Sequence, residues 1–450
     1  MKHQDCINSG NSLKKGLNAY SLAGIGIGGI IGAGFFLGSS IAINHAGPSV
    51  ILAFLLGGII MSQVLGAMTS ISINRPVQGS FRVYTEEFLG KFTGYLLGWT
   101  IFVSGILSIS SEAIAAGIFM RYWFKSIPLF IFAMITLIIV MGINGLGTKY
   151  FGFIESSMAM VKIICLIIFI VLGVFFITKN WDTTNQNVFH SLHSFFPNKI
   201  TGFFQSMLIV VFTFSGISTV AMATSEVKRP CYEIPKATVL LTFGIVILYV
   251  VSMFVVVSIV KWNLINLTLS PFVQTFNKMG YGWASVLTNG IILIATISVM
   301  GGTYYGCMQI LVSLSSAKEA PKLFSITNRK GFYKSAWLAI ALFGAIVVVS
   351  SFFLGTKLFS YLISASSYFS FFNWIVNFIT YLKWLNKKIE TDIYKSPLIK
   401  GRYGAIGTII VIIILIVLSL QVADFRVGFY IALGVLSLIS LSYKLILDKE

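Results

Sequence analysis

Lys162 and Glu112 are ionisable residues that lie inside long apolar segments of the sequence. A charged Lys at the centre of a bilayer costs about 2.5–3.5 kcal/mol on insertion scales, so such a residue has a function or a strong partner. Removal from water also favours the neutral amine, which suits a Lys for proton exchange. Lys162 is therefore interpreted either as a proton-coupling group or as a structural donor to backbone carbonyls.

Three acidic residues accompany this lysine. Glu112 is interpreted either as an interior acid on a ligand or proton path, or as an interfacial acid paired with Arg121 or a hydroxyl. Glu155 and Glu226 lie at the ends of apolar segments and are interpreted as helix caps or members of inner-gate salt bridges, with substrate contact as the alternative. Candidate partners for those two are Lys149, Lys228 and Arg229.

Residues 26–34 read GIGGIIGAG, which is five glycines in nine positions. Each Gly destabilises a helix interior by about 1 kcal/mol relative to Ala. Backbone freed by a break cannot face lipid, so it must line a cavity or pack against protein. A half-helix after the break directs its N–H groups and positive dipole end into that cavity, which favours a carboxylate. A close helix crossing through Gly28 and Gly32 explains the glycines equally well.

A second interruption occurs at residues 213–221, which read TFSGISTVA. Taken alone, these small and hydroxyl residues favour helix packing. However, the two interruptions fall in the first and sixth apolar segments, which are the first members of two five-segment halves. Paired breaks of this kind favour a binding site at the midplane of an inverted-repeat transporter.

The composition is that of a polytopic membrane protein. Of the 450 residues, 56% are apolar and 10% are charged, and the mean hydropathy is +0.89. These values exclude an ordinary soluble enzyme, a secreted disulfide scaffold and a disordered chain. Twelve membrane-spanning segments are predicted, at residues 18–44, 47–73, 93–119, 127–146, 152–178, 202–224, 237–260, 282–312, 335–354, 358–382, 403–421 and 427–447.

The Lys and Arg residues indicate the orientation. With the N-terminus inside, 23 of the 32 fall in the tails and even-numbered connections, 8 fall in outer connections, and Lys162 lies in a span. This asymmetry predicts that both termini are cytoplasmic. It also explains the net charge of +18 without a nucleic-acid partner. The sequence contains no Walker loop, so no nucleotide cofactor is expected. The spacing of its His, Cys and carboxylate residues does not indicate a metal site.

Several motifs together resemble the amino acid–polyamine–organocation permeases, and more narrowly their bacterial and fungal amino acid permease branch. The first-helix stretch at residues 26–38 reads GIGGIIGAGFFLG. The others, in family order over about residues 15–330, are RPVQGSF at 75–81, Gly98-Trp99, Glu112, YWF at 122–124, Ile127-Pro128, Glu155 with Lys162, EVKRP at 226–230, IPKA at 234–237 and SPF at 270–272.

The resemblance implies an all-α integral membrane fold, the leucine-transporter-like 5+5 inverted repeat with two additional C-terminal helices. The expected division is a tail at 1–16, repeat 1 at 17–178, an outer connection at 179–200, repeat 2 at 201–385 and two further helices with the C-terminal tail at 386–450. The implied location is the plasma membrane.

The same resemblance implies a secondary-active amino acid transporter that is proton-coupled and works by alternating access. The substrate carboxylate is expected at the N–H groups of Gly28 through Gly34, the ammonium at carbonyls near Ile27 and at Phe214 and Ser215, and the side chain among spans three, six, eight and ten. The candidate substrate-binding residues are Ile27, Gly28, Gly29, Ile30, Ile31, Gly32, Ala33, Gly34, Phe212, Phe214, Ser215, Gly216, Ile217 and Ser218.

Lys162 matches a fifth-span Lys that replaces a sodium ion in proton-coupled relatives, and it is expected to brace the first-helix break against span eight. Glu112 is the second candidate for proton coupling. Many relatives carry Glu where this chain has Ser218, which favours a small or uncharged substrate. Alternatives are a transporter of polyamines or other organic amines, an amino acid exchanger, and a non-transporting membrane enzyme or receptor.

Overall fold

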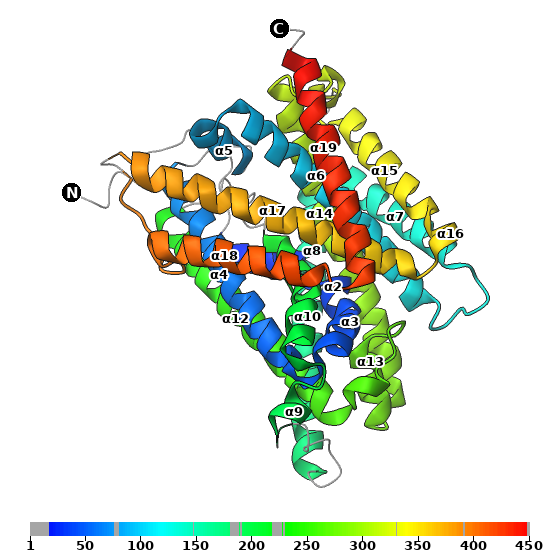
Figure 1. Ribbon diagram of the computed structural model, residues 1–450. Helices are drawn as coiled ribbons and strands as arrows, with labels where there is room; N and C mark the ends of the chain where they lie inside the picture. The colour runs from blue at the N-terminus through cyan, green and yellow to red at the C-terminus, as the bar shows by residue number, and fades with distance from the viewer. Residues whose placement is uncertain are drawn as a thin grey trace.

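The computed structural model is a bundle of long helices (Figure 1). It describes residues 18–75, 81–146, 148–180, 189, 191–217, 227, 230–329, 331–389 and 392–447. In Figure 1 the last helix, α19 (Ala423–Leu447), runs to the top of the view, and α9 (Leu192–Phe195) lies toward the bottom.

The first half of the chain contains the following helices: α1 (Ala19–Ile30), α2 (Ala33–Phe36), α3 (Gly38–Ala46), α4 (Val50–Asn74), α5 (Phe81–Leu89), α6 (Lys91–Met120), α7 (Leu129–Gly145), α8 (Thr148–Lys179), α10 (Lys199–Phe214) and the 3₁₀ turn η4 (Ser215–Ile217). The second half contains α12 (Pro230–Ile259), α13 (Pro271–Lys278), α14 (Gly282–Ser316), α15 (Lys334–Val349), α16 (Ser351–Leu354), α17 (Lys357–Lys387), α18 (Gly401–Ser419) and α19 (Ala423–Leu447).

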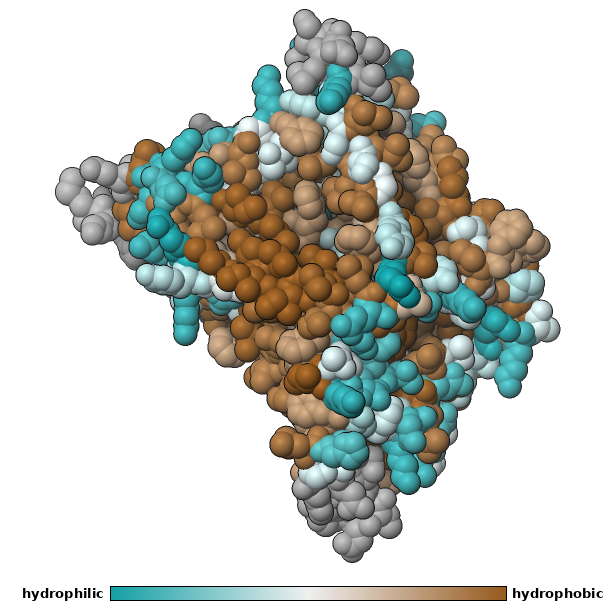
Figure 2. Space-filling model, in the orientation of Figure 1, coloured by the Kyte–Doolittle hydropathy of each residue, from teal (hydrophilic) through white to brown (hydrophobic). Residues whose placement is uncertain are grey.

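The length and hydropathy of these helices confirm the predicted all-α membrane class. Within the described residues, ten helices are long and apolar enough to cross a membrane, and the apolar α7 is shorter, at 17 residues. Apolar side chains gather across α4, α17 and α18, with hydrophilic ones toward the ends of the bundle (Figure 2). The count of twelve spans stays a prediction that exceeds these ten. In the sixth predicted segment, residues 218–224 lie outside the described part.

The predicted break in the first segment is narrower than the glycine run. The amide of Ile31 still donates to Ile27 O at 3.0 Å, and Gly32 is extended, with φ −139° and ψ −160°. α2 then begins at Ala33, so only Ile31 and Gly32 leave the helix.

The glycines before the break allow close packing instead of unwinding. A Cβ on Gly28 would lie 2.9 Å from the Cβ of Ala159 in α8. The glycine run at residues 26–34 therefore contains both a helix break and a close helix crossing, at different residues. Gly28 permits a helix contact, and Gly32 forms the break. The result is that α1 lies against α8, α12, α14 and η4.

Candidate functional site

The break places a carboxylate at the start of α2. The amide of Ala33 donates to Oε2 of Glu112 at 2.9 Å and to Oε1 at 3.1 Å. Glu112 comes from α6 and is only 2% exposed. The first amides of a helix have no partner within it and favour an anion, so this carboxylate satisfies them. The anion-binding position predicted from the sequence is thus occupied by the protein's own side chain.

Gly32 is required by this arrangement. A Cβ there would lie 2.7 Å from Oε1 of Glu112 and 2.8 Å from Cγ2 of Val299 in α14. A larger residue would therefore separate Glu112 from Ala33. The interpretation of Glu112 as an interfacial acid paired with Arg121 is wrong, because its carboxylate is bonded to the first-helix break.

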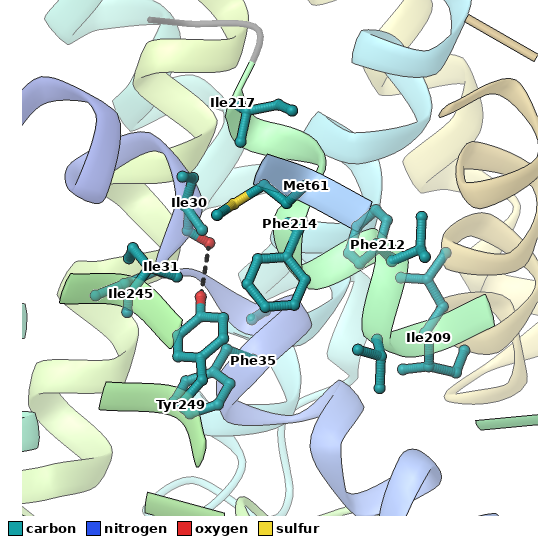
Figure 3. Packing of buried hydrophobic residues seen from close by; sticks show 14 of the residues in the cluster. Ile30, Ile31, Phe35, Met61, Ile209, Phe212, Phe214, Ile217, Ile245 and Tyr249 are labelled. Carbon is teal, nitrogen blue, oxygen red and sulfur yellow. Dashed lines mark hydrogen bonds between the residues drawn. The ribbon is translucent and has the colours of Figure 1, made fainter. Parts of the chain in front are cut away.

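The carbonyls at the end of α1 take partners from two other helices. Nζ of Lys162 in α8 donates to Gly28 O at 2.5 Å. The hydroxyl of Tyr249 in α12 donates to Ile30 O at 3.3 Å (Figure 3). Ile27 O accepts from the amide of Ile31 at 3.0 Å, and Ile27 does not line the main cavity, so the expected ammonium contact near Ile27 stays a prediction. Within the described residues, Gly29 O has no recorded partner, and Gly29 lines the main cavity.

The second interruption lies directly opposite. α10 ends at Phe214, and Ser215 and Gly216 continue as the turn η4. A Cβ on Gly216 would overlap Gly29 O and lie 2.8 Å from the carbonyl carbon of Gly29. The two interruptions therefore meet backbone to backbone, which only Gly at this position permits.

A cavity extends from this meeting point between α6, α10, α14 and α17. These helices correspond to the four spans that the resemblance implies. The predicted residues that line it are Gly29, Ile30, Gly34, Glu112, Phe212, Ser215 and Gly216. The other predicted residues in the described part are not part of its lining, and Phe214 instead packs near Tyr249, at 5.3 Å between ring centroids. Ser218 lies outside the described residues.

Sequence reasoning missed most of the polar lining. These residues are Ser104, Ser108, Thr303, Ser366, Ser370, Asn373 and Asn377. The serines and asparagines among them recur at spacings of three, four or seven within α6 and α17, which is a signal for one polar helix face. Glu112 is the one charged side chain among the lining residues that the structure describes.

The cavity extends toward one end of the bundle. Its lining includes Phe81, the first residue of α5. The helix α5 lies against α6 and α17. The opposite end is closed by aromatic rings, in which Phe35 stacks on Tyr249 at 3.6 Å between centroids (Figure 3). Phe272 of α13 adds to this cluster at 5.1 Å from Phe35.

Two ion-pair groups link the elements at the cavity's end. Arg82 of α5 bonds Glu319 at 2.8 Å and Glu86 at 3.1 Å. Burial raises the pKa of Glu319 to about 7, against the opposing effect of Arg82, so Glu319 gains or loses a proton near neutral pH. Nearby, Arg75 bonds the buried Asp392 at 3.0 Å.

Lys162 and Glu155 share one face of α8, two turns apart. Lys162 is fully buried and Glu155 is 6% exposed. The hydroxyl of Ser298 in α14 donates to Oε1 of Glu155 at 2.7 Å. Glu155 therefore has an interior contact with α14, and its expected inner-gate salt bridges stay a prediction. Lys149, Lys228 and Arg229 have no described side chains, and Glu226 lies outside the described residues.

Comparison with known proteins agrees with this architecture. A family model for amino acid permeases matches residues 22–448. The chain is 34% identical to an uncharacterized amino acid permease of Bacillus subtilis over 391 residues, covering 86% of this chain and 88% of the relative. It is 31% identical to the gamma-aminobutyric acid permease of Bacillus subtilis, covering 85% and 82%. It is 28% identical to the aromatic amino acid transport protein of Escherichia coli, covering 85% and 84%.

Proposed function

The chain belongs to the amino acid permease family, and we propose that it is a proton-coupled importer of neutral amino acids that works by alternating access. Transport rather than enzyme catalysis follows from the family. We also infer that residues 17–178 and 201–385 form the two inverted repeats. The bias of Lys and Arg supports cytoplasmic termini, and the family supports insertion in the plasma membrane.

The observation that carries this proposal is the meeting of two helix interruptions at the head of a cavity. The substrate ammonium bonds Gly29 O, and the carboxylate bonds the amides at the start of α2. Both groups are supplied by backbone, so they recognise what every amino acid shares. The side chain then lies among Ser, Thr and Asn residues of α6, α14 and α17.

The lining favours a neutral substrate side chain. Glu112 is its one described charge, and this carboxylate is bonded to Ala33. A polyamine or another organic amine needs an additional acidic group for its extra cation, and no second carboxylate is found among the described lining residues. The importer is therefore favoured over the amine transporter.

The test is ligand stabilisation of the purified protein. We expect one or a few neutral L-amino acids to raise its Tm, since a ligand at 100 times its Kd stabilises the bound fold by about 2.7 kcal/mol. The methyl esters of the same amino acids should fail, because they lack the carboxylate. Radiolabelled uptake into proteoliposomes with an acidic exterior should then select the same compounds. Stabilisation by none of the twenty amino acids would exclude the proposal.

Glu112 competes with the substrate for the start of α2 in this proposal. Replacing it by Gln converts a charge-assisted hydrogen bond, worth about 1.5–3 kcal/mol, into a neutral one worth about 0.5–1.5 kcal/mol. We expect Glu112→Gln to bind the zwitterion about 10-fold more tightly at pH 7.5, measured by ligand-dependent Tm shifts. Glu233→Gln is the matched control. The carboxylate of Glu233 also accepts from a backbone amide at a helix start, that of Ala19 in α1, but Glu233 does not line the cavity. Weaker binding by Glu112→Gln would contradict competition.

A further inference from the structure

A second, smaller cavity lies beside Glu155. It measures about 10 Å³, and its lining includes Ile143 of α7, Ile154 and Met158 of α8, and Gly301 of α14. Its polar side chains are Glu155 and Ser298. About 10–15 Å³ is the space that one water molecule requires, and a buried water needs two to four polar partners. Glu155 and Ser298 supply two polar partners for one water in a lining that is otherwise apolar.

This cavity is separate from the main one, and Lys162 lines neither. Lys162 is fully buried and bonded to Gly28 O, so it needs an intermediary to exchange a proton with water. Glu155 lies seven residues earlier on α8, about 10 Å along the axis, and faces the same side. Glu155 is thus the acid that lies on the same helix face as Lys162 and also lines the small cavity.

The charges around Lys162 assign different tasks to its two acids. The carboxylates facing it are Glu112 from α6 and Glu155 on its own helix, and no further described titratable group approaches it from α1 or α14. Glu112 is bonded to the α2 amide of Ala33. Glu155 has one hydroxyl partner, Ser298, which can either donate to a carboxylate or accept from a carboxylic acid.

We propose that Glu155 is the proton relay of this transporter, through a route separate from the substrate cavity. In a conformation that brings the two groups within hydrogen-bond distance, the Lys162 ammonium gives its proton to the Glu155 carboxylate, leaving a neutral amine and a carboxylic acid. The acid then passes the proton to a water in the small cavity, and so to the side of the bundle where α7 ends and α8 begins. This inference rests on the proposed function, because it assumes proton-coupled transport.

The experiment separates proton coupling from substrate movement. Proteoliposomes are assayed with the radiolabelled amino acid that gives the largest Tm shift, both for accumulation driven by a proton gradient and for exchange without one. We expect Glu155→Gln to lower accumulation at least 10-fold more than it lowers exchange. Glu155→Asp, which keeps a carboxyl group, should restore part of the accumulation. Ser298→Ala should shift the ratio in the same direction by less.

Asp424→Asn is the control, since Asp424 is exposed at the start of α19 and lines neither cavity. Equal losses of accumulation and exchange in Glu155→Gln and Ser298→Ala would overturn the relay and assign Glu155 a structural role. So would accumulation by Glu155→Gln at the wild-type level. Failure of the wild-type protein to accumulate any amino acid would instead refute the proposed function, so the two failures are distinguishable.

Discussion

Lys162→Met is expected to lower proton-driven uptake at least about 100-fold. The Met side chain keeps much of the volume of Lys but removes the ammonium that bonds Gly28 O. Glu112 and Glu155 then lose their buried countercharge. Removing one partner of a buried ionic group costs about 3–5 kcal/mol, and each 1.4 kcal/mol is tenfold in an equilibrium constant. Uptake of radiolabelled amino acid into proteoliposomes at several external pH values measures the loss.

Lys179→Met is the matched control, because Lys179 is an exposed lysine at the C-terminal end of α8. It should keep wild-type uptake and its dependence on external pH. The coupling role of Lys162 is excluded if Lys162→Met folds, binds substrate and still shows the same response to external pH. A uniform fall in uptake at every pH would indicate only the structural bond to Gly28.

Gly216→Ala is expected to abolish substrate binding. The new Cβ would overlap the carbonyl oxygen of Gly29 and lie 3.0 Å from the Cα of Ile30. Both neighbours are backbone atoms, so no side-chain rotation relieves the clash. η4 must move away from α1, which removes Gly29 O from its position opposite η4. The expected measurement is a ligand-dependent Tm shift that falls to zero while the protein stays folded.

Gly244→Ala is the control for this substitution. Gly244 lies in the helix α12, and a Cβ there meets nothing within 4 Å. Because Ala favours a helix over Gly, this variant should keep its ligand-dependent Tm shift. A wild-type Tm shift in Gly216→Ala would mean that the substrate does not bind where the two interruptions meet.

The two ends of the proposed pathway are closed by different chemistry. Stacked rings around Phe35 and Tyr249 close one end, and ion pairs of Arg75 and Arg82 join elements at the other. Apolar rings separate with little directional preference, whereas the pair of Arg82 and Glu319 depends on charge. In the alternating-access cycle that we propose, a hydrophobic closure at one end is exchanged for an ionic closure at the other, with the same two helix breaks between them.

Local sequence determined the class of the protein and the location of its first break. Runs of about 20 apolar residues identify membrane helices without knowledge of their neighbours. Five glycines in nine positions identify a weak helix, and Lys162 stands out because its own segment is apolar. The family motifs added the expected positions of carboxylate and ammonium around that break. Each of these inferences uses composition or order within a short stretch of chain.

Tertiary structure decided which groups the break actually meets. Glu112 lies 79 positions from Ala33, Lys162 lies 134 from Gly28, and Ser298 lies 143 from Glu155. The interpretation of Glu112 as an interfacial acid failed because its carboxylate is bonded by the amide of Ala33, which is distant in the sequence. Gly29, and not Ile27, lines the cavity for the same reason, since helix ends and neighbouring helices together determine which backbone groups face it. Such pairings depend on how helices pack in three dimensions, and no local pattern in a single sequence encodes them.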